Sequence, residues 1–339
     1  MVNCKLILTS SILVNSSICL YLSLLISLGF WGIMKVLGWI SILIGMAYIT
    51  LWERKILGAI HRRRGLNIVI AQPLVDGVKL IIKEYIVPSK TNNNIYLITA
   101  MMSLGIGLII WGFIPITNTG WMFDTNISIL FWISIGSIGV YSIIGGGWSS
   151  NSKYSIIGSI RSIGQMISYE VTIGIIVITI VYINNTMNII DISNKQFFMW
   201  NIFGLWLGML IMFISGLAET SRSLFDLLEG ESEIVSGYNV EYTGITFGFY
   251  FMGETLQLMI MSSIIVICYL GGWYVFGFKS EIFMGIKLVF VIFIIMLIRA
   301  AVLRFRFDQL MKLIWEGFLP LSMGYIIWIF CIFTSMFRL

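Results

Sequence analysis

Charged side chains are scarce in this chain of 339 residues. Aspartate, glutamate, lysine and arginine together make up 11% of it, while apolar residues make up 58%. A typical soluble domain has about 25% charged and 45–50% apolar residues. The shortage of charge therefore excludes an ordinary soluble domain and indicates a protein that crosses a membrane several times.

Metal-ligating residues are also few. The chain has one histidine, His61, and four cysteines without paired spacing, at positions 4, 19, 268 and 331. Zinc sites and iron–sulfur clusters need several such ligands close together, and one histidine cannot supply both axial ligands to a series of haems. We therefore expect no metal site and no redox centre in this chain.

Long apolar segments take up most of the sequence. About 20 apolar residues are needed to cross the hydrocarbon core, and eight segments qualify: 28–52, 95–116, 127–147, 163–183, 199–218, 244–272, 282–302 and 314–336. These segments are too long for barrel strands. We predict an all-α membrane bundle of about eight transmembrane helices over 28–339. The apolar extension 1–27 would lengthen the first helix, add a ninth span or lie at the interface.

Basic residues mark one face of the predicted bundle. The loops 53–93, 148–162, 219–243 and 299–313 hold 15 of the 21 lysines and arginines. By the positive-inside rule, this face is the bacterial cytoplasm or the mitochondrial matrix. We therefore attribute the excess of basic residues to the orientation of the chain in the membrane. No basic stripe with interleaved aromatic residues occurs outside these loops, so the sequence does not predict nucleic-acid binding.

Acidic residues gather in one predicted loop. The segment 219–242 contains six of the sixteen acids, and Arg222 lies among them. A connection between two helices does not require six carboxylates, so we interpret this loop as chemically active. The alternative is a solvated acidic loop.

Two further acids, Glu170 and Glu254, lie inside apolar segments with no basic residue within four positions. A charge at the bilayer centre costs on the order of 2.5–3.5 kcal/mol, so both should face the bundle interior. A carboxyl group away from water can take up and release protons near neutral pH. The alternative is a structural hydrogen bond from a neutral carboxyl group.

Five long segments resemble one family in order and in sequence. They are WERKILGAIHRRRGLN (52–67), AQPLVDGVKLIIKE (71–84), GWSSNSKYSIIGSIRSIGQMISYEV (147–171), LAETSRSLFDLLEGESEIVSGYNVEY (217–242) and RFRFDQLMKLIWEGFLPLS (304–322). From about residue 28 to its end, the chain is similar to subunit 1 of the respiratory NADH:quinone oxidoreductase, complex I.

This resemblance implies a core membrane subunit of the proton-translocating NADH:ubiquinone reductase. Such a subunit forms part of the quinone chamber, begins an acidic proton or charge relay, and carries no redox centre. Ubiquinone would be the substrate, and FMN and iron–sulfur clusters would belong to partner subunits. The expected partners are the hydrophilic quinone-module subunits on the matrix side, adjacent small membrane subunits and lipids. The expected location is the mitochondrial inner membrane, or alternatively the bacterial plasma membrane, with the acidic loop on the matrix or cytoplasmic side.

The resemblance also assigns roles to individual residues. It implies an interfacial helix over 55–64, and the polar and apolar spacing over 72–87 independently predicts a second amphipathic segment. The implied relay residues are Glu170, Glu219, Glu229, Glu231, Glu233 and Glu254. The implied quinone-site residues are Arg54, Asp76, Arg222, Asp226, Arg299 and Arg304.

The chain departs from the family at three turns. Leu66, Leu224 and Leu303 stand where relatives usually have proline, and the loop between Asn67 and Gln72 is shorter. Proline fixes the backbone angle φ, so we expect these turns, and with them the quinone chamber, to differ in shape.

Two other classes of membrane protein share some of these sequence features. A membrane anchor of a related membrane-bound hydrogenase would share the acidic-loop architecture without requiring quinone. A proton-coupled secondary transporter would also carry intramembrane acids, but it would usually show internal repeats, and none is detected between the two halves of the chain.

Overall fold

The computed structural model describes residues 36–65, 71–117, 122–221, 225–226, 237–275, 277–302 and 304–337. The chain divides into a unit of residues 1–45 and a unit of residues 46–339. The first unit is described only from residue 36, where the helix Val36–Ile60 begins. The predicted extension 1–27 lies outside the described residues.

Seven helices in the described part of the chain are long and apolar enough to cross a membrane, which confirms the all-α membrane fold. They are Val36–Ile60, α3 (Asn93–Phe113), α4 (Ser128–Ser149), α5 (Lys153–Asn184), α10 (Ile245–Tyr269), α11 (Glu281–Ala301) and Phe307–Ser335. The last span runs through α12 (Phe307–Lys312), the π-helical turn η2 (Leu313–Phe318) and α13 (Leu319–Phe337).

The predicted loop 148–162 is mostly wrong. Helix α5 begins at Lys153 and continues for 32 residues, so residues 150–152 alone separate it from α4. The Ser152 hydroxyl accepts a hydrogen bond from the Ser155 backbone N–H at 3.3 Å. A serine in this position satisfies one of the free N–H groups of a helix start, which explains why α5 begins before its apolar stretch.

The predicted span 199–218 is interrupted. It forms the short helix α7 (Asn201–Gly204) and then α8 (Trp206–Glu219). The 14 residues of α8 are about 21 Å long at 1.5 Å per residue, which is less than the roughly 30 Å hydrocarbon core. An eighth full-length span is therefore absent from the described residues.

The predicted interfacial helix over 55–64 is also different in the structure. Helix Val36–Ile60 continues through most of this segment, and Arg62 ends it with a left-handed φ of 54°. The chain then folds back, so that a Cβ on Gly65 would lie 3.1 Å from the Cα of Lys55. The second amphipathic segment forms α2 (Gln72–Ile82), which ends five residues earlier than predicted.

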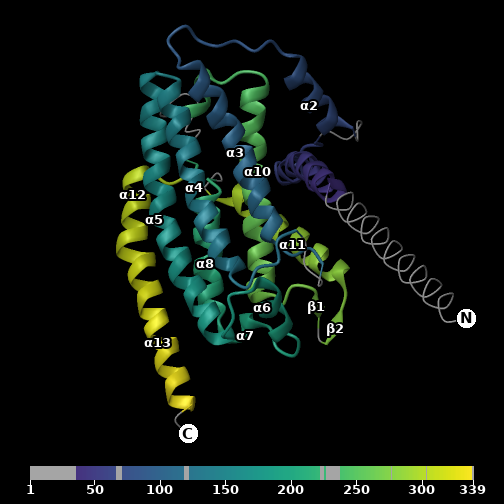
Figure 1. The fold of residues 1–339 in the computed structure, drawn as a ribbon, viewed down its shortest axis with the longest axis vertical. Coiled ribbons are helices and arrows are strands. Elements are labelled where there is room, and N and C mark those ends of the chain that lie inside the picture. Colours follow the sequence, from purple (N-terminus) through teal and green to yellow (C-terminus); the bar gives the residue numbers. More distant parts are fainter. Residues whose placement is uncertain are drawn as a thin grey trace, which may run out of the picture. The chain divides into compact units, whose positions relative to one another are not determined.

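Helix α10 is the central element of the second unit, because 78% of its most apolar 18-residue stretch is buried. Figure 1 shows α3 and α10 side by side. Glycines permit this close approach: a Cβ on Gly107 would lie 3.2 Å from the Leu256 side chain, and a Cβ on Gly253 would lie 3.2 Å from the Ser103 backbone. Small residues commonly allow such contacts between membrane helices.

Three of the predicted same-face loops meet at one end of the bundle, at the top of Figure 1. The Asn92 backbone N–H donates to the Ser149 carbonyl at 3.2 Å, and the Asn151 side chain donates to the Lys90 carbonyl at 3.2 Å. The Thr243 hydroxyl donates to the Ile86 carbonyl at 3.1 Å. These bonds place the segments around 90, 150 and 243 on the same face.

The other end carries the short helix α6 (Ile189–Lys195) and a small hairpin. Its strands, β1 (Tyr274–Val275) and β2 (Phe278–Lys279), pair antiparallel, with Tyr274 opposite Lys279. Gly277 makes the turn with a φ of 86°, a conformation that glycine adopts without steric cost.

Candidate functional site

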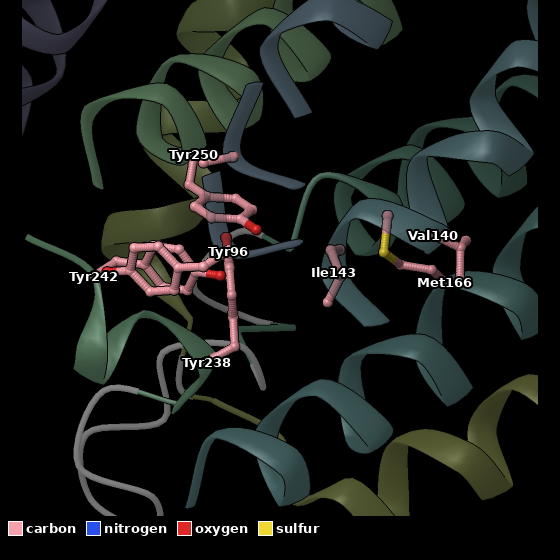
Figure 2. Packing of buried hydrophobic residues seen from close by; sticks show 8 residues of the cluster. Tyr96, Val140, Ile143, Met166, Tyr238, Tyr242 and Tyr250 are labelled. Atoms are coloured by element: carbon pink, nitrogen blue, oxygen red, sulfur yellow. The ribbon is translucent and has the colours of Figure 1, made fainter. Parts of the chain in front are cut away.

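Four tyrosines form a buried aromatic cluster beside the end of the acidic loop. Figure 2 shows Tyr96, Tyr238, Tyr242 and Tyr250 gathered together. The rings of Tyr96 and Tyr242 stack at 4.2 Å between centroids, while Tyr250 meets Tyr242 and Tyr238 edge-on at 4.8 and 5.0 Å. Offset-stacked and edge-to-face pairs stabilise packing beyond the area they bury.

This cluster holds the 3₁₀ helix η1 (Gly237–Glu241) against the bundle. The Tyr96 hydroxyl donates to the Glu241 carbonyl at 2.8 Å, and the Tyr242 hydroxyl donates to the Gly146 carbonyl at 3.2 Å. The Ser155 hydroxyl donates to the Tyr238 carbonyl at 3.2 Å. The C-terminal end of the acidic loop is thereby attached to α3, α4 and α5.

Two small cavities adjoin each other among the helices, and Tyr238 of η1 lines the larger one. The larger has a volume of about 40 Å³ for water-sized occupants, and the smaller has about 20 Å³. One water needs roughly 10–15 Å³ by the same measure, so both can hold water. They share five lining residues: Ile110, Gly136, Glu219, Gln257 and Ile260.

Three carboxyl groups from three helices line these cavities. Glu254 of α10 lines the larger, Glu170 of α5 lines the smaller, and Glu219, the last residue of α8, lines both. No lysine, arginine or histidine occurs among their described lining residues. Glu170 and Glu254 thus face the bundle interior, as the cost of exposing a charge to lipid predicts.

Neighbouring groups act on these carboxyl groups. Glu219 interacts electrostatically with Glu170, and the Gln257 side chain lines both cavities beside it. The Tyr238 hydroxyl donates to Glu254 Oε1 at 3.0 Å. Two carboxyl groups that share one enclosed site repel each other when both are ionised, so the proton occupancies of Glu170 and Glu219 depend on each other.

Two consecutive residues near the end of helix Val36–Ile60 form ion pairs with different elements. Arg54 pairs with Asp76 of α2 at 2.9 Å, and Gln72 also donates to Asp76 at 3.2 Å. Glu53 pairs with Arg299 of α11. The Arg54–Asp76 pair is half-exposed, whereas the Glu53 side chain is 10% exposed.

Two more of the predicted quinone-site residues, Asp226 and Arg304, lie at or near the connection between α11 and α12. Asp226 is partly buried, and the ring of its neighbour Phe225 stacks on Phe305 at 6.0 Å. Arg304 precedes Phe305, and its buried Nη2 atom has no hydrogen-bond partner within the described parts of the chain. Gln165 fixes this region by donating to the Phe225 and Ala218 carbonyls, both at 2.8 Å.

Several predicted residues lie outside the described residues: Arg222, Glu229, Glu231, Glu233 and the departures Leu66, Leu224 and Leu303. Over the described ranges, no group of three or more His, Cys, Asp or Glu side chains is placed to hold a metal ion.

Tyr238, Gln257 and the tyrosine cluster were not predicted from the sequence. One signal was present, because Tyr238, Tyr242, Tyr250 and Glu254 are spaced by multiples of four. Residues four apart lie on one face of a helix. Here, however, the four residues do not belong to one helix, because the chain breaks between η1 and α10. Helical spacing alone would therefore not have justified placing these four side chains together.

Comparisons with known proteins agree with this architecture. The model of the family described as NADH dehydrogenase matches residues 33–330. NADH-ubiquinone oxidoreductase chain 1 of Metridium senile is 43% identical over 296 residues, covering 85% of this chain and 89% of the relative. The corresponding protein of Cyanidium caldarium is 41% identical over 298 residues, covering 85% and 87%. A bacterial relative, an NADH-quinone oxidoreductase subunit of Rhodospirillum rubrum, is 40% identical over 328 residues, covering 88% and 95%. The chain therefore belongs to the NADH dehydrogenase family, together with mitochondrial proteins named NADH-ubiquinone oxidoreductase chain 1 and their bacterial NADH-quinone oxidoreductase counterparts.

Proposed function

We propose that this chain is a core membrane subunit of a proton-translocating NADH:quinone oxidoreductase and that its buried carboxyl groups begin the proton relay of that complex. The names of its relatives support the oxidoreductase assignment and do not favour a hydrogenase anchor or an independent transporter. Quinone is the proposed substrate, and FMN and iron–sulfur clusters of partner subunits supply the electrons.

The observation that carries the relay is the placement of Glu170, Glu219 and Glu254 around two adjoining cavities. Each acid comes from a different helix, so the path crosses the bundle instead of following one helix. Because Glu219 lines both cavities, it can exchange a proton with either neighbour through water. A charge change near this chain would shift the shared protons, because the ionisation of coupled carboxyl groups is interdependent.

The quinone-facing part is proposed to lie at the end of the bundle where helix Val36–Ile60, α2 and the segment 299–308 come together. Arg54, Asp76 and Arg299 already form ion pairs there. A half-exposed pair such as Arg54–Asp76 contributes little to stability, so an arriving polar headgroup can replace one partner at low cost. We place Arg304, Arg222 and Asp226 in the same region.

The acids Glu229, Glu231 and Glu233 complete the proposal as the link between quinone and Glu219. Clustered carboxyl groups remain partly protonated, so quinone reduction can release or take up protons there. The acidic loop then faces the mitochondrial matrix or the bacterial cytoplasm, in the mitochondrial inner membrane or the bacterial plasma membrane. Its partners are the hydrophilic quinone-module subunits, adjacent small membrane subunits and lipids.

Replacing Glu254 by glutamine tests the relay. Glutamine keeps the size and polarity of the side chain but cannot bind or release a proton at neutral pH. In the assembled complex, NADH-driven proton translocation and quinone reduction should both fall several-fold. NADH oxidation by an artificial acceptor that bypasses quinone should persist.

Glu281→Gln is the matched control, because Glu281 is exposed at the start of α11 and lines neither cavity. Its translocation should stay at the level of the unaltered complex. Normal proton translocation in Glu254→Gln would refute the proposed relay.

A further inference from the structure

The turn η1 is in unusually close contact with α5. A Cβ added to Gly158 would lie 3.0 Å from the Gly237 Cα and 3.1 Å from the Tyr238 backbone nitrogen. Gly237 has a left-handed φ of 59°, which non-glycine residues rarely adopt. The backbone entering Tyr238 is therefore fixed in position by two glycines.

The Tyr238 side chain points from this turn to the relay. It is 1% exposed, and its hydroxyl lies 3.0 Å from Glu254 Oε1 at the wall of the larger cavity. Burial, followed by the negative charge of Glu254, raises the pKa of Tyr238 well above its ordinary value. The hydroxyl therefore keeps its proton at physiological pH and remains available as a donor.

We infer that Tyr238 is a positioning residue of the relay: its hydroxyl holds the Glu254 carboxylate at the cavity wall and connects the end of the acidic loop to that carboxylate. This inference rests on the proposed function, since it concerns how Glu254 is controlled within it. The O–H bond of Tyr238 stays intact throughout, and the proton that moves is the one exchanged between Glu254 and the cavity.

The physical basis is the preference of a hydroxyl donor for a charged acceptor. A hydrogen bond to a carboxylate favours the ionised form over the neutral form. In the structure, the Tyr238 hydroxyl therefore favours the ionised form of Glu254 and holds that carboxylate at the cavity wall.

Tyr238→Phe removes the hydroxyl and keeps the ring that packs on Tyr250. The test is the pH profile of quinone reduction in the assembled complex, measured with proton translocation per NADH. The acidic limb of the profile should move to higher pH by roughly one unit, the size expected for loss of a hydrogen bond to a charged group. The number of protons translocated per NADH should fall.

Other titratable groups face the same cavities and could influence the profile. Within the described residues they are Glu170 of α5, Glu219 of α8, and Tyr250 of α10. Tyr274→Phe is the control, because its hydroxyl donates to Asn194 Oδ1 at 3.0 Å at the other end of the bundle and its side chain lines neither cavity. It should leave the pH profile unchanged.

The double variant Tyr238→Phe/Glu254→Gln distinguishes positioning from an independent effect. If Tyr238 acts through Glu254, the double variant should translocate protons no worse than Glu254→Gln alone, whereas independent effects would add. An additive loss, an unshifted pH profile in Tyr238→Phe, or failure of that variant to assemble would each overturn the inference. If Glu254→Gln itself translocates protons normally, the proposed function fails instead.

Discussion

Replacing Glu219 by glutamine is expected to reduce NADH-driven proton translocation more than any other single change in the described relay. Glu219 lines both cavities and interacts electrostatically with Glu170. Positioned proton-transfer groups contribute on the order of 10²–10⁴ in rate. Because water in the cavities can replace part of that contribution, we expect a loss of about tenfold or more.

The measurement is proton uptake by sealed vesicles that contain the assembled complex, with NADH and quinone supplied. Oxidation of NADH by an artificial acceptor should remain near normal, which shows that the redox subunits are intact. Glu281→Gln again serves as the exposed control. Full translocation in Glu219→Gln would mean that protons do not pass through the two cavities.

Of the substitutions proposed for this chain, Arg299→Met should cause the largest loss of stability. Its partner Glu53 has a side chain that is only 10% exposed, so the variant would leave a carboxylate enclosed without this counter-charge. Breaking a buried pair on one side costs about 3–5 kcal/mol. Arg299 itself is 34% exposed, so we expect the substitution to lower the free energy of unfolding by about 3 kcal/mol or less, the lower end of that range. The amount of assembled complex and its thermal stability would both decrease.

A second substitution checks the cause of this loss. Glu53→Gln combined with Arg299→Met removes both charges, and should restore part of the stability. Arg306→Met is the matched control, because the Arg306–Asp308 pair is 3.5 Å long and more than 70% exposed on both sides. Exposed pairs contribute about 0–1 kcal/mol. Equal losses from Arg299→Met and Arg306→Met would contradict the structural role of the Glu53–Arg299 pair.

The general fold follows from the sequence because the bilayer imposes strong rules. The cost of exposing polar groups to lipid predicts both the long helices and the inward direction of Glu170 and Glu254. These predictions depend on single residues and their solvent, and not on contacts between distant segments. They were therefore accessible without a structure.

Features that depend on distant contacts were not predictable in this way. The α7–α8 break is stabilised by Gln196 and Asn201, whose side chains donate to the Cys268 carbonyl at 3.1 and 2.9 Å. Nothing near position 205 in the sequence reveals these bonds. The same reason applies to Tyr238, whose partner Glu254 lies beyond the start of the next helix.

The ion pairs show the limit of the family resemblance. It implied that Arg54, Asp76 and Arg299 share a quinone site, but it did not indicate their pairing. The structure joins Arg54 to Asp76 and joins Arg299 to Glu53, a residue without an assigned role in the sequence analysis. Pairing depends on how α2 and α11 approach helix Val36–Ile60, and this approach is set by packing between distant segments.

The most direct test of the account is an infrared difference spectrum of the assembled complex between its oxidised state and its state during quinone reduction by NADH. A protonated carboxyl group has a C=O stretching band that disappears on ionisation. We expect a redox-dependent carboxyl band that is lost or reduced in Glu219→Gln and retained in Glu281→Gln. Identical carboxyl bands in the unaltered complex and in Glu219→Gln would contradict the claim that these buried acids carry the translocated protons.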